Sequence, residues 1–323
     1  MNIAFLPVPL SDEAMRLASQ IGISDIVAGR PAGDSGPVWD FMALLRMRQR
    51  VESAGLRLSV IESIGVADSI KLGLPSRDED LDNFCQSLSN MGKAGIPVLC
   101  YNWMAVFNWL RTSMADRGRG GALVTSYKHD LMKNAPLTEY GEVSEEQLWE
   151  NLEYFLKRVV PVAEEANVKL ALHPDDPPLS PIRGISRIIT SFEAYKRVIE
   201  LVPSPNNGLT FCQGNFAAMA DVTDVSEAIR YFGQRDKIFF AHFRDVSSKV
   251  PNFSEVFHDE GPTDMLATMQ AYRAVDFDGP IRPDHAPTLE GESNDHPGYM
   301  VMGKIFAVGY MKGLIEAAQK YPQ

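Results

Sequence analysis

The chain alternates eight short apolar runs with eight segments of helical periodicity, and this alternation restricts its possible folds more than any other feature. The apolar runs span residues 3–6, 25–28, 56–62, 96–101, 168–173, 208–212, 238–242 and 280–284. The helical segments span residues 12–21, 38–54, 78–94, 144–166, 192–201, 225–232, 263–275 and 299–318. Runs such as LRLSVIE and VKLALH are almost continuously apolar, which is typical of parallel strands covered by helices.

Eight strand–helix units in 323 residues predict an α/β fold of the (β/α)8 TIM-barrel type. A doubly wound open sheet is the alternative, but no GxGxxG pattern follows the first strand. No linker, charge block or low-complexity tract divides the chain, so we expect residues 1–323 to form a single catalytic domain. Two loops are enlarged, 103–143 after the fourth strand and 243–262 after the seventh. Loops of this length at the carboxyl end of a barrel are usually functional.

The composition excludes several classes of protein. The chain has 31 Lys and Arg against 42 Asp and Glu, and its net charge of −11 argues against a nucleic acid or an anionic membrane as partner. The three cysteines lack CxxC spacing, which argues against a disulfide-stapled fold or a structural zinc module. The amino terminus lacks a basic n-region and a cleavage pattern, and the most apolar stretch, 98–110, is too short to span a membrane. We therefore expect a cytoplasmic protein.

Four consecutive predicted strands end on residues that commonly bind metal ions. His173 ends the fifth strand, Cys212 the sixth, His242 the seventh and Asp284 the eighth. The carboxyl ends of barrel strands converge on one site, so these side chains can surround a single divalent ion. Two imidazoles, a thiolate and a carboxylate suit Mn, Fe, Zn or Co better than Mg or Ca.

Each of these residues has a structural explanation when it is taken alone. A histidine at a strand end often only makes hydrogen bonds, and a cysteine in an apolar strand is usually a small buried hydrophobe. We expect that ordinary role for Cys85 and Cys100. Cys212 is interpreted differently, because the equivalent positions of three other strands also carry ligand-type residues.

Candidates for proton transfer and anion binding lie near the same strand ends. His285 follows Asp284 directly. Tyr299 is expected to open the last helix, from which it could reach the site, although an aromatic residue in that position more often only packs the helix. Asp175 and Asp176 are expected either to support the metal-binding histidine or to shape a proline-rich turn. Guanidinium groups at or just past strand ends are candidates for holding a substrate carboxylate, namely those of Arg111, Arg244 and Arg282.

Several of these segments resemble the mannonate dehydratase family, in the xylose-isomerase-like group of barrels. They are LALHPDDPP, GLTFCQGNF, AHFRDV, FSEVFHDEGPTDM, GPIRPDH and the late PGY, and the matches run from about Tyr101 to Leu314. The resemblance implies dehydration of D-mannonate to 2-keto-3-deoxy-D-gluconate in hexuronate catabolism, with Mn²⁺ or Fe²⁺ as cofactor. By motif position it implies that the metal ligands are His173, Cys212, His242 and Asp284, and that the acid and base are His285 and Tyr299.

The chain departs from the usual pattern of this family at Asn108, Leu110 and Ala286, all in loops expected to face the substrate. A related aldonic acid is therefore a second candidate substrate. A xylose-isomerase-like sugar isomerase or epimerase is a rival reaction, although a cysteine ligand would be unusual there, and a barrel that binds metal or sugar acid without catalysis is a rival of another class. By analogy with other barrels of this group, the chain is also a candidate homo-oligomer.

Overall fold

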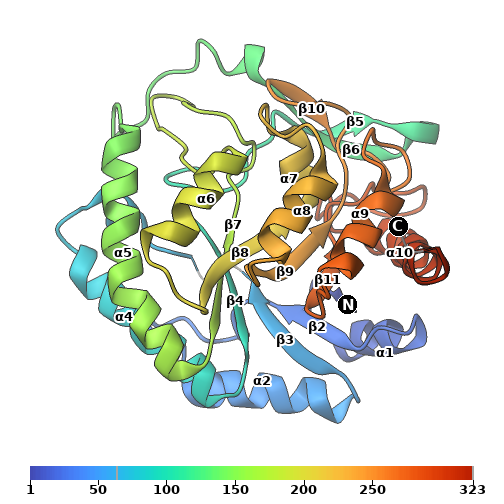
Figure 1. Cartoon of the computed structure of the whole chain (residues 1–323), viewed down its shortest axis with the longest axis horizontal. Coiled ribbons are helices and arrows are strands. Elements are labelled where there is room, and N and C mark those ends of the chain that lie inside the picture. The colour runs from blue at the N-terminus through green and yellow to red at the C-terminus, as the bar shows by residue number, and fades with distance from the viewer. Residues whose placement is uncertain (63–64, 322–323) are drawn as a thin grey trace.

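The computed structural model describes residues 1–62 and 65–321, and within them eight parallel strands close into a barrel surrounded by helices (Figure 1). Each strand pairs with its neighbours in chain order, and the first strand closes the barrel by pairing with the last. The predicted TIM barrel is confirmed. The barrel strands are β1 (Asn2–Phe5), β2 (Asp25–Ala28), β3 (Arg57–Glu62), β4 (Val98–Asn102), β7 (Lys169–His173), β8 (Asn207–Cys212), β9 (Ile238–Phe243) and β11 (Pro280–Pro283).

Eight of the helices in the described residues correspond to the predicted helical segments, whereas the short helices α3 and α7 were not predicted. N-cap residues explain where several of the helices begin, because side chains such as that of Ser144 accept a hydrogen bond from a backbone N–H of the first turn. Over residues 1–62 and 65–321, none of the helices combines the length and apolar character needed to cross a bilayer. The helices are α1 (Asp12–Gln20), α2 (Phe41–Ser53), α3 (Asp68–Leu72), α4 (Arg77–Lys93), α5 (Glu145–Ala166), α6 (Phe192–Leu201), α7 (Gln213–Ala218), α8 (Val225–Gly233), α9 (Met265–Ala274) and α10 (Val301–Lys320).

Two predicted boundaries differ in ways that concern the site. Strand β11 ends at Pro283, so Asp284 lies one residue beyond it. Helix α10 begins at Val301 rather than at Tyr299, because Gly298 adopts a left-handed backbone conformation (φ 82°) and Met300 is extended. Tyr299 therefore belongs to the loop before the helix, and its side chain is not tied to a helical face.

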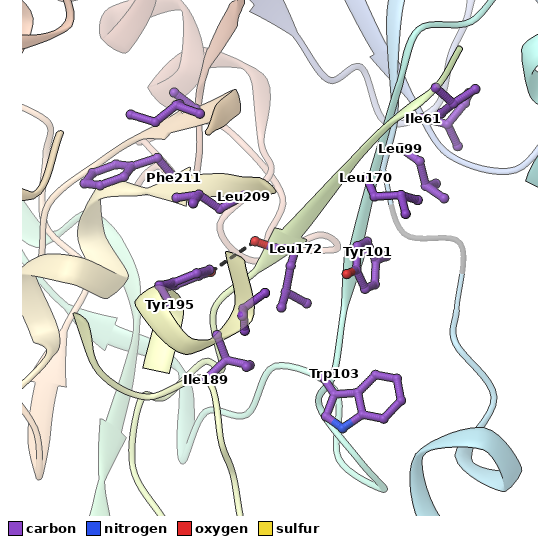
Figure 2. Packing of buried hydrophobic residues seen from close by; sticks show 14 of the residues in the cluster. Ile61, Leu99, Tyr101, Trp103, Leu170, Leu172, Ile189, Tyr195, Leu209 and Phe211 are labelled. Carbon is purple, nitrogen blue, oxygen red and sulfur yellow. Dashed lines mark hydrogen bonds between the residues drawn. The ribbon is translucent and has the colours of Figure 1, made fainter. Parts of the chain in front are cut away.

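Side chains alternate along each barrel strand between the helix layer and the barrel interior. Leu170 and Leu172 of β7 pack outward in the main apolar cluster, where the Tyr195 hydroxyl also donates a 3.0 Å hydrogen bond to the carbonyl oxygen of Leu172 (Figure 2). Ala171 between them faces inward and packs with other interior residues such as Val60 and Phe240. The same alternation makes the last residue of β7, His173, an inward-facing residue at the carboxyl end of the barrel.

The two segments predicted as enlarged loops pair with each other. Strands β5 (Ser113–Arg117) and β6 (Leu123–Lys128) follow the fourth barrel strand, and β10 (Asn252–Ser254) follows the seventh. They form an antiparallel sheet in the order β10–β6–β5, which lies to one side of the barrel in Figure 1. Short 3-10 turns at Arg119–Gly121 and His129–Leu131 flank β6. This sheet fixes the position of the residue directly after β10, Glu255, whose backbone N–H donates to the carbonyl oxygen of Thr125.

Candidate metal centre and acid–base pair

Strand periodicity brings the four predicted metal ligands together at the carboxyl end of the barrel. One potential ligand atom from each of His173, Cys212 and His242 lies within 4.8 Å of the others. Asp284 joins them, because its Oδ2 lies 3.7 Å from the Cys212 Sγ and 3.6 Å from the His242 Nδ1. The prediction that these side chains converge is thus met by the geometry. Three of them are buried and His173 is partly buried.

The hydrogen bonding of both imidazoles leaves a ring nitrogen available to a metal ion. The Nδ1 of His173 makes a 2.7 Å hydrogen bond with the carbonyl oxygen of Pro174, so Nδ1 carries the hydrogen and Nε2 keeps a free lone pair. Burial lowers the pKa of His173, which favours the neutral ring that a metal requires. Neither ring nitrogen of the buried His242 has a hydrogen-bond partner among the described residues. Such unsatisfied buried nitrogens are explained if a bound ion takes one of them.

His242 lies between two carboxylates. The Glu62 Oε1 is 3.5 Å from its Nε2, and the Asp284 Oδ2 is 3.6 Å from its Nδ1. Burial and the nearby Arg282 would lower the pKa of His242, but the two carboxylates raise it to about 9 in the metal-free protein. This site therefore favours a positive charge at its centre, supplied either by a proton on His242 or by a cation.

Two other groups of potential ligands lie close by, and both are less suited to a metal ion. The first comprises Glu62, Cys100 and His242. Burial raises the pKa of the Cys100 thiol well above its usual value, and Arg282 donates two hydrogen bonds to Glu62. The second comprises Asp176, Glu255 and His285, and its carboxylates are already occupied by arginines.

The three predicted substrate-binding arginines all lie at the site, but each is buried and held by carboxylates. Arg111 binds Asp176 through two hydrogen bonds of 2.6 and 2.8 Å, and also binds Glu255. Arg244 contacts Asp176 and Glu255 as well, and its Nε donates to Asp284. Arg282 links Glu62 to the other oxygen of Asp284. Of the three, only Arg282 lines the cavity beside the metal-ligand cluster.

The candidate acid and base are in direct contact. The Nε2 of His285 lies 2.9 Å from the Tyr299 hydroxyl, and its Nδ1 lies 3.1 Å from the Oε1 of Glu255. The Trp109 ring packs beside the His285 imidazole with their centres 5.1 Å apart. Burial raises the pKa of Tyr299 well above its usual value, and nearby Asp284 raises it further, so the phenol is protonated at neutral pH.

One cavity of about 140 Å³ joins these groups. His285 and Tyr299 line it together with His173, His242 and Asp284, whereas the fourth candidate ligand, Cys212, is fully buried. The remaining lining comes mainly from β4 and the loop that follows it, namely Tyr101, Asn102, Met104, Asn108 and Trp109.

Sequence reasoning missed two carboxylates that the structure brings to the site, Glu62 and Glu255. Glu62 ends β3 and faces inward, so the rule that identified His173 on β7 would have found it. Glu255 directly follows β10 in the loop after β9, and its contacts with Thr125 and Val246 place it beside His285. Asp175 accepts a hydrogen bond from the backbone N–H of Ile189 and lies 3.8 Å from Arg187, and Asp176 pairs with Arg111 and Arg244, so arginines rather than His173 are the charged partners of both carboxylates.

A family model described as D-mannonate dehydratase (UxuA) matches residues 9–323. The chain belongs to the D-mannonate dehydratase family. It is 39% identical over 319 residues to a mannonate dehydratase from Thermotoga maritima, with 88% of each chain covered. It is 38% identical over 338 residues to one from Streptococcus equi subsp. zooepidemicus, covering 96% of this chain and 91% of the relative.

Solved structures agree with the family assignment. The crystal structure of mannonate dehydratase from Streptococcus suis serotype 2 matches with a TM-score of 0.91 and 35% identity, covering 99% of this chain and 94% of that one. A D-tagatose 3-epimerase-like protein matches with a TM-score of 0.64 at only 13% identity, and this likeness extends to the fold alone. The comparisons therefore favour the dehydratase family over the isomerase or epimerase alternative.

If Cys212 is a metal ligand, replacing it should weaken metal binding. We expect Cys212→Ala to raise the dissociation constant for Mn²⁺ more than about 100-fold, because a lost ligand costs more than the 10- to 100-fold typical of supporting residues. Isothermal titration calorimetry and metal analysis of the purified protein measure this. Cys85→Ala is the matched control, since Cys85 lies partly exposed on α4. Equal Mn²⁺ affinity in the two variants would contradict the assignment of Cys212.

Proposed function

We propose that the chain dehydrates D-mannonate to 2-keto-3-deoxy-D-gluconate and water, as a hydro-lyase of hexuronate catabolism. Membership of the D-mannonate dehydratase family supports this function. The observation that carries the proposal is the joining of a candidate metal centre and a hydrogen-bonded His285–Tyr299 pair in one cavity. Such an arrangement provides both charge stabilisation and proton transfer, which are the two requirements of this reaction.

We propose Mn²⁺ or Fe²⁺ as the cofactor, held by His173, Cys212, His242 and Asp284. Two imidazole nitrogens, one sulfur and one carboxylate oxygen form a mixed donor set that suits these ions better than Mg²⁺ or Ca²⁺. When bound, such an ion supplies Lewis-acid chemistry at the substrate carboxylate and a neighbouring hydroxyl. A reducing compartment such as the cytoplasm fits this proposal, because Cys212 must remain a free thiol to serve as a ligand.

The side chains of the protein account for the proton movements. Dehydration removes a proton from C2 and expels the C3 hydroxyl as water, so one group must accept a proton and another must donate one. We assign His285 as the base at C2, because an imidazole can accept a proton near neutral pH. Tyr299 is assigned as the acid at the C3 hydroxyl, since its raised pKa keeps the phenol protonated. Their 2.9 Å contact allows a proton to pass from His285 to Tyr299 after each turnover.

The arginines have different proposed roles. Arg282 lines the cavity, and we propose that it binds the substrate carboxylate end while it also holds Asp284. Arg111 and Arg244 are predicted substrate ligands as well, but their guanidinium groups already bind Asp176 and Glu255. Their proposed contribution is therefore to hold this buried wall of the site in place, where each ionised group is paired.

A related aldonic acid is the second candidate substrate. Asn102 and Asn108 both line the cavity, and the Asn102 amide donates a 3.3 Å hydrogen bond to the Asn108 Oδ1. These two uncharged amides offer hydrogen bonds to sugar hydroxyls. Aldonic acids differ in the configuration of their hydroxyls, and hydrogen bonds to such polar groups discriminate between them.

A substrate screen tests the proposed function. We expect protein loaded with Mn²⁺ or Fe²⁺ to convert D-mannonate into a 2-keto-3-deoxy acid faster than any other C5 or C6 aldonic acid, with much slower turnover for Mg²⁺-loaded protein. A colour test for 2-keto-3-deoxy acids and proton NMR of the products measure this. Preferred turnover of another aldonic acid would establish the second candidate. An epimerised product that retains every hydroxyl would contradict the dehydratase assignment.

The roles of His285 and Tyr299 are tested by His285→Asn and Tyr299→Phe. Each variant should bind metal normally and lose about 10²- to 10⁴-fold in kcat, because a positioned acid or base contributes rate rather than metal affinity. Tyr321→Phe is the control, since Tyr321 is 70% exposed at the end of α10. Near-wild-type kcat in His285→Asn would exclude His285 as the base.

A further inference from the structure

The buried carboxylate of Glu255 contacts three other side chains that can carry a positive charge, those of Arg111, Arg244 and His285. Its side chain is only 2% exposed. Its Oε1 accepts hydrogen bonds from Arg111 at 2.6 Å and Arg244 at 3.0 Å, and Arg244 also reaches its Oε2 at 2.9 Å. The same Oε1 lies 3.1 Å from the Nδ1 of His285. One buried carboxylate thus connects an arginine pair to the candidate base.

The backbone of Glu255 is fixed independently of these contacts. Its N–H donates to the carbonyl oxygen of Thr125, directly after the pairing of β10 with β6. An isolated bridge to Val246 holds it from the other side. A carboxylate anchored at both its backbone and its charged head is suited to holding a ring in one orientation.

The contact with Glu255 also determines which nitrogen of His285 carries the hydrogen. Glu255 accepts hydrogen bonds from the guanidinium groups of Arg111 and Arg244, and Arg244 lowers its pKa against the effect of burial, so the side chain is ionised and can only accept hydrogen bonds. The His285 Nδ1 must therefore carry the hydrogen. Its Nε2 is then left with a lone pair and accepts the hydrogen bond from the Tyr299 hydroxyl.

We propose that Glu255 is a positioning residue that holds His285 in the Nδ1–H tautomer and directs its Nε2 into the cavity. This inference rests on the proposed function, because that function gives the orientation of His285 its purpose. Glu255, His285 and Tyr299 form a carboxylate–imidazole–phenol chain in which the carboxylate lies on the side away from the cavity. In other enzymes, a buried carboxylate behind a histidine fixes the tautomer in the same way, and its loss lowers kcat strongly.

Two substitutions at Glu255 separate this role from simple charge pairing. Glu255→Asp keeps a negative charge at this position but shortens the side chain by one methylene group, which lengthens its contacts with His285 and with the two arginines. We expect it to lower kcat at least about 10²-fold with KM changed less than about threefold, because substrate contacts remain while the base is misaligned. Glu255→Gln removes the charge from the arginines and is expected to destabilise the fold as well. Asp176→Asn controls for lost arginine pairing, since Asp176 shares both arginines and makes no hydrogen bond to His285 within the described residues.

Nitrogen-15 NMR of histidine-labelled, Zn²⁺-loaded protein reports the tautomer without relying on turnover. Wild type and Asp176→Asn should show a His285 ring protonated at Nδ1 and bare at Nε2, whereas Glu255→Asp should show a mixture of tautomers. A bare Nδ1 in the wild type, or wild-type kcat in a folded Glu255→Asp variant, would overturn the proposal. If the wild type fails to dehydrate any aldonic acid but shows the expected tautomer, the proposed function fails while the positioning role of Glu255 stands.

Discussion

The buried ion pairs at the carboxyl end of the barrel are the interactions on which the rest of the site depends. Arg111, Arg244 and Arg282 lie among four carboxylates, those of Glu62, Asp176, Glu255 and Asp284. Removing one partner from a buried pair typically costs about 3–5 kcal/mol, because the other charge is left without compensation. These seven side chains together carry one net negative charge. A cation beside them therefore improves the balance of buried charge. One of its candidate ligands, Asp284, belongs to this network, and another, His242, lies 3.6 Å from Asp284.

The network also connects the candidate metal centre with the residues proposed to transfer protons. Arg244 donates to Asp284, a candidate metal ligand, and to Glu255, the hydrogen-bond partner of His285. A displacement of Arg244 would thus affect both the candidate metal centre and the candidate base. Under the proposed function, arginines that do not line the cavity would therefore contribute to catalysis by positioning other groups.

The sequence was sufficient to predict the barrel and the convergence of four ligand-type residues, because both follow from local periodicity. To identify an inward-facing residue at the end of a strand, it is enough to locate the strand and to know which alternate residues face the barrel interior, as for His173 and Cys212. The same rule applies to Glu62, which was overlooked. Glu255 could not be found in this way, since a contact between two distant loops brings it to His285.

The arginines show a second limit of sequence reasoning. Their positions near strand ends were predicted, but a sequence pattern does not encode which carboxylate each guanidinium meets across the barrel. Arg111 lies 65 positions from Asp176 and 144 from Glu255, yet it binds both. Tyr299 illustrates the opposite case: from the sequence alone, packing of a helix is the more common explanation for it, but the structure places it in the loop before α10 with its hydroxyl against His285.

The central claim is that one metal ion binds among His173, Cys212, His242 and Asp284, next to the acid–base pair. The most direct test is anomalous X-ray diffraction from crystals of the Mn²⁺-loaded protein, measured on both sides of the manganese absorption edge. The account predicts one strong peak within coordination distance of these four side chains. A peak at the neighbouring group of Glu62, Cys100 and His242, or no peak near His242 in catalytically active protein, would contradict it.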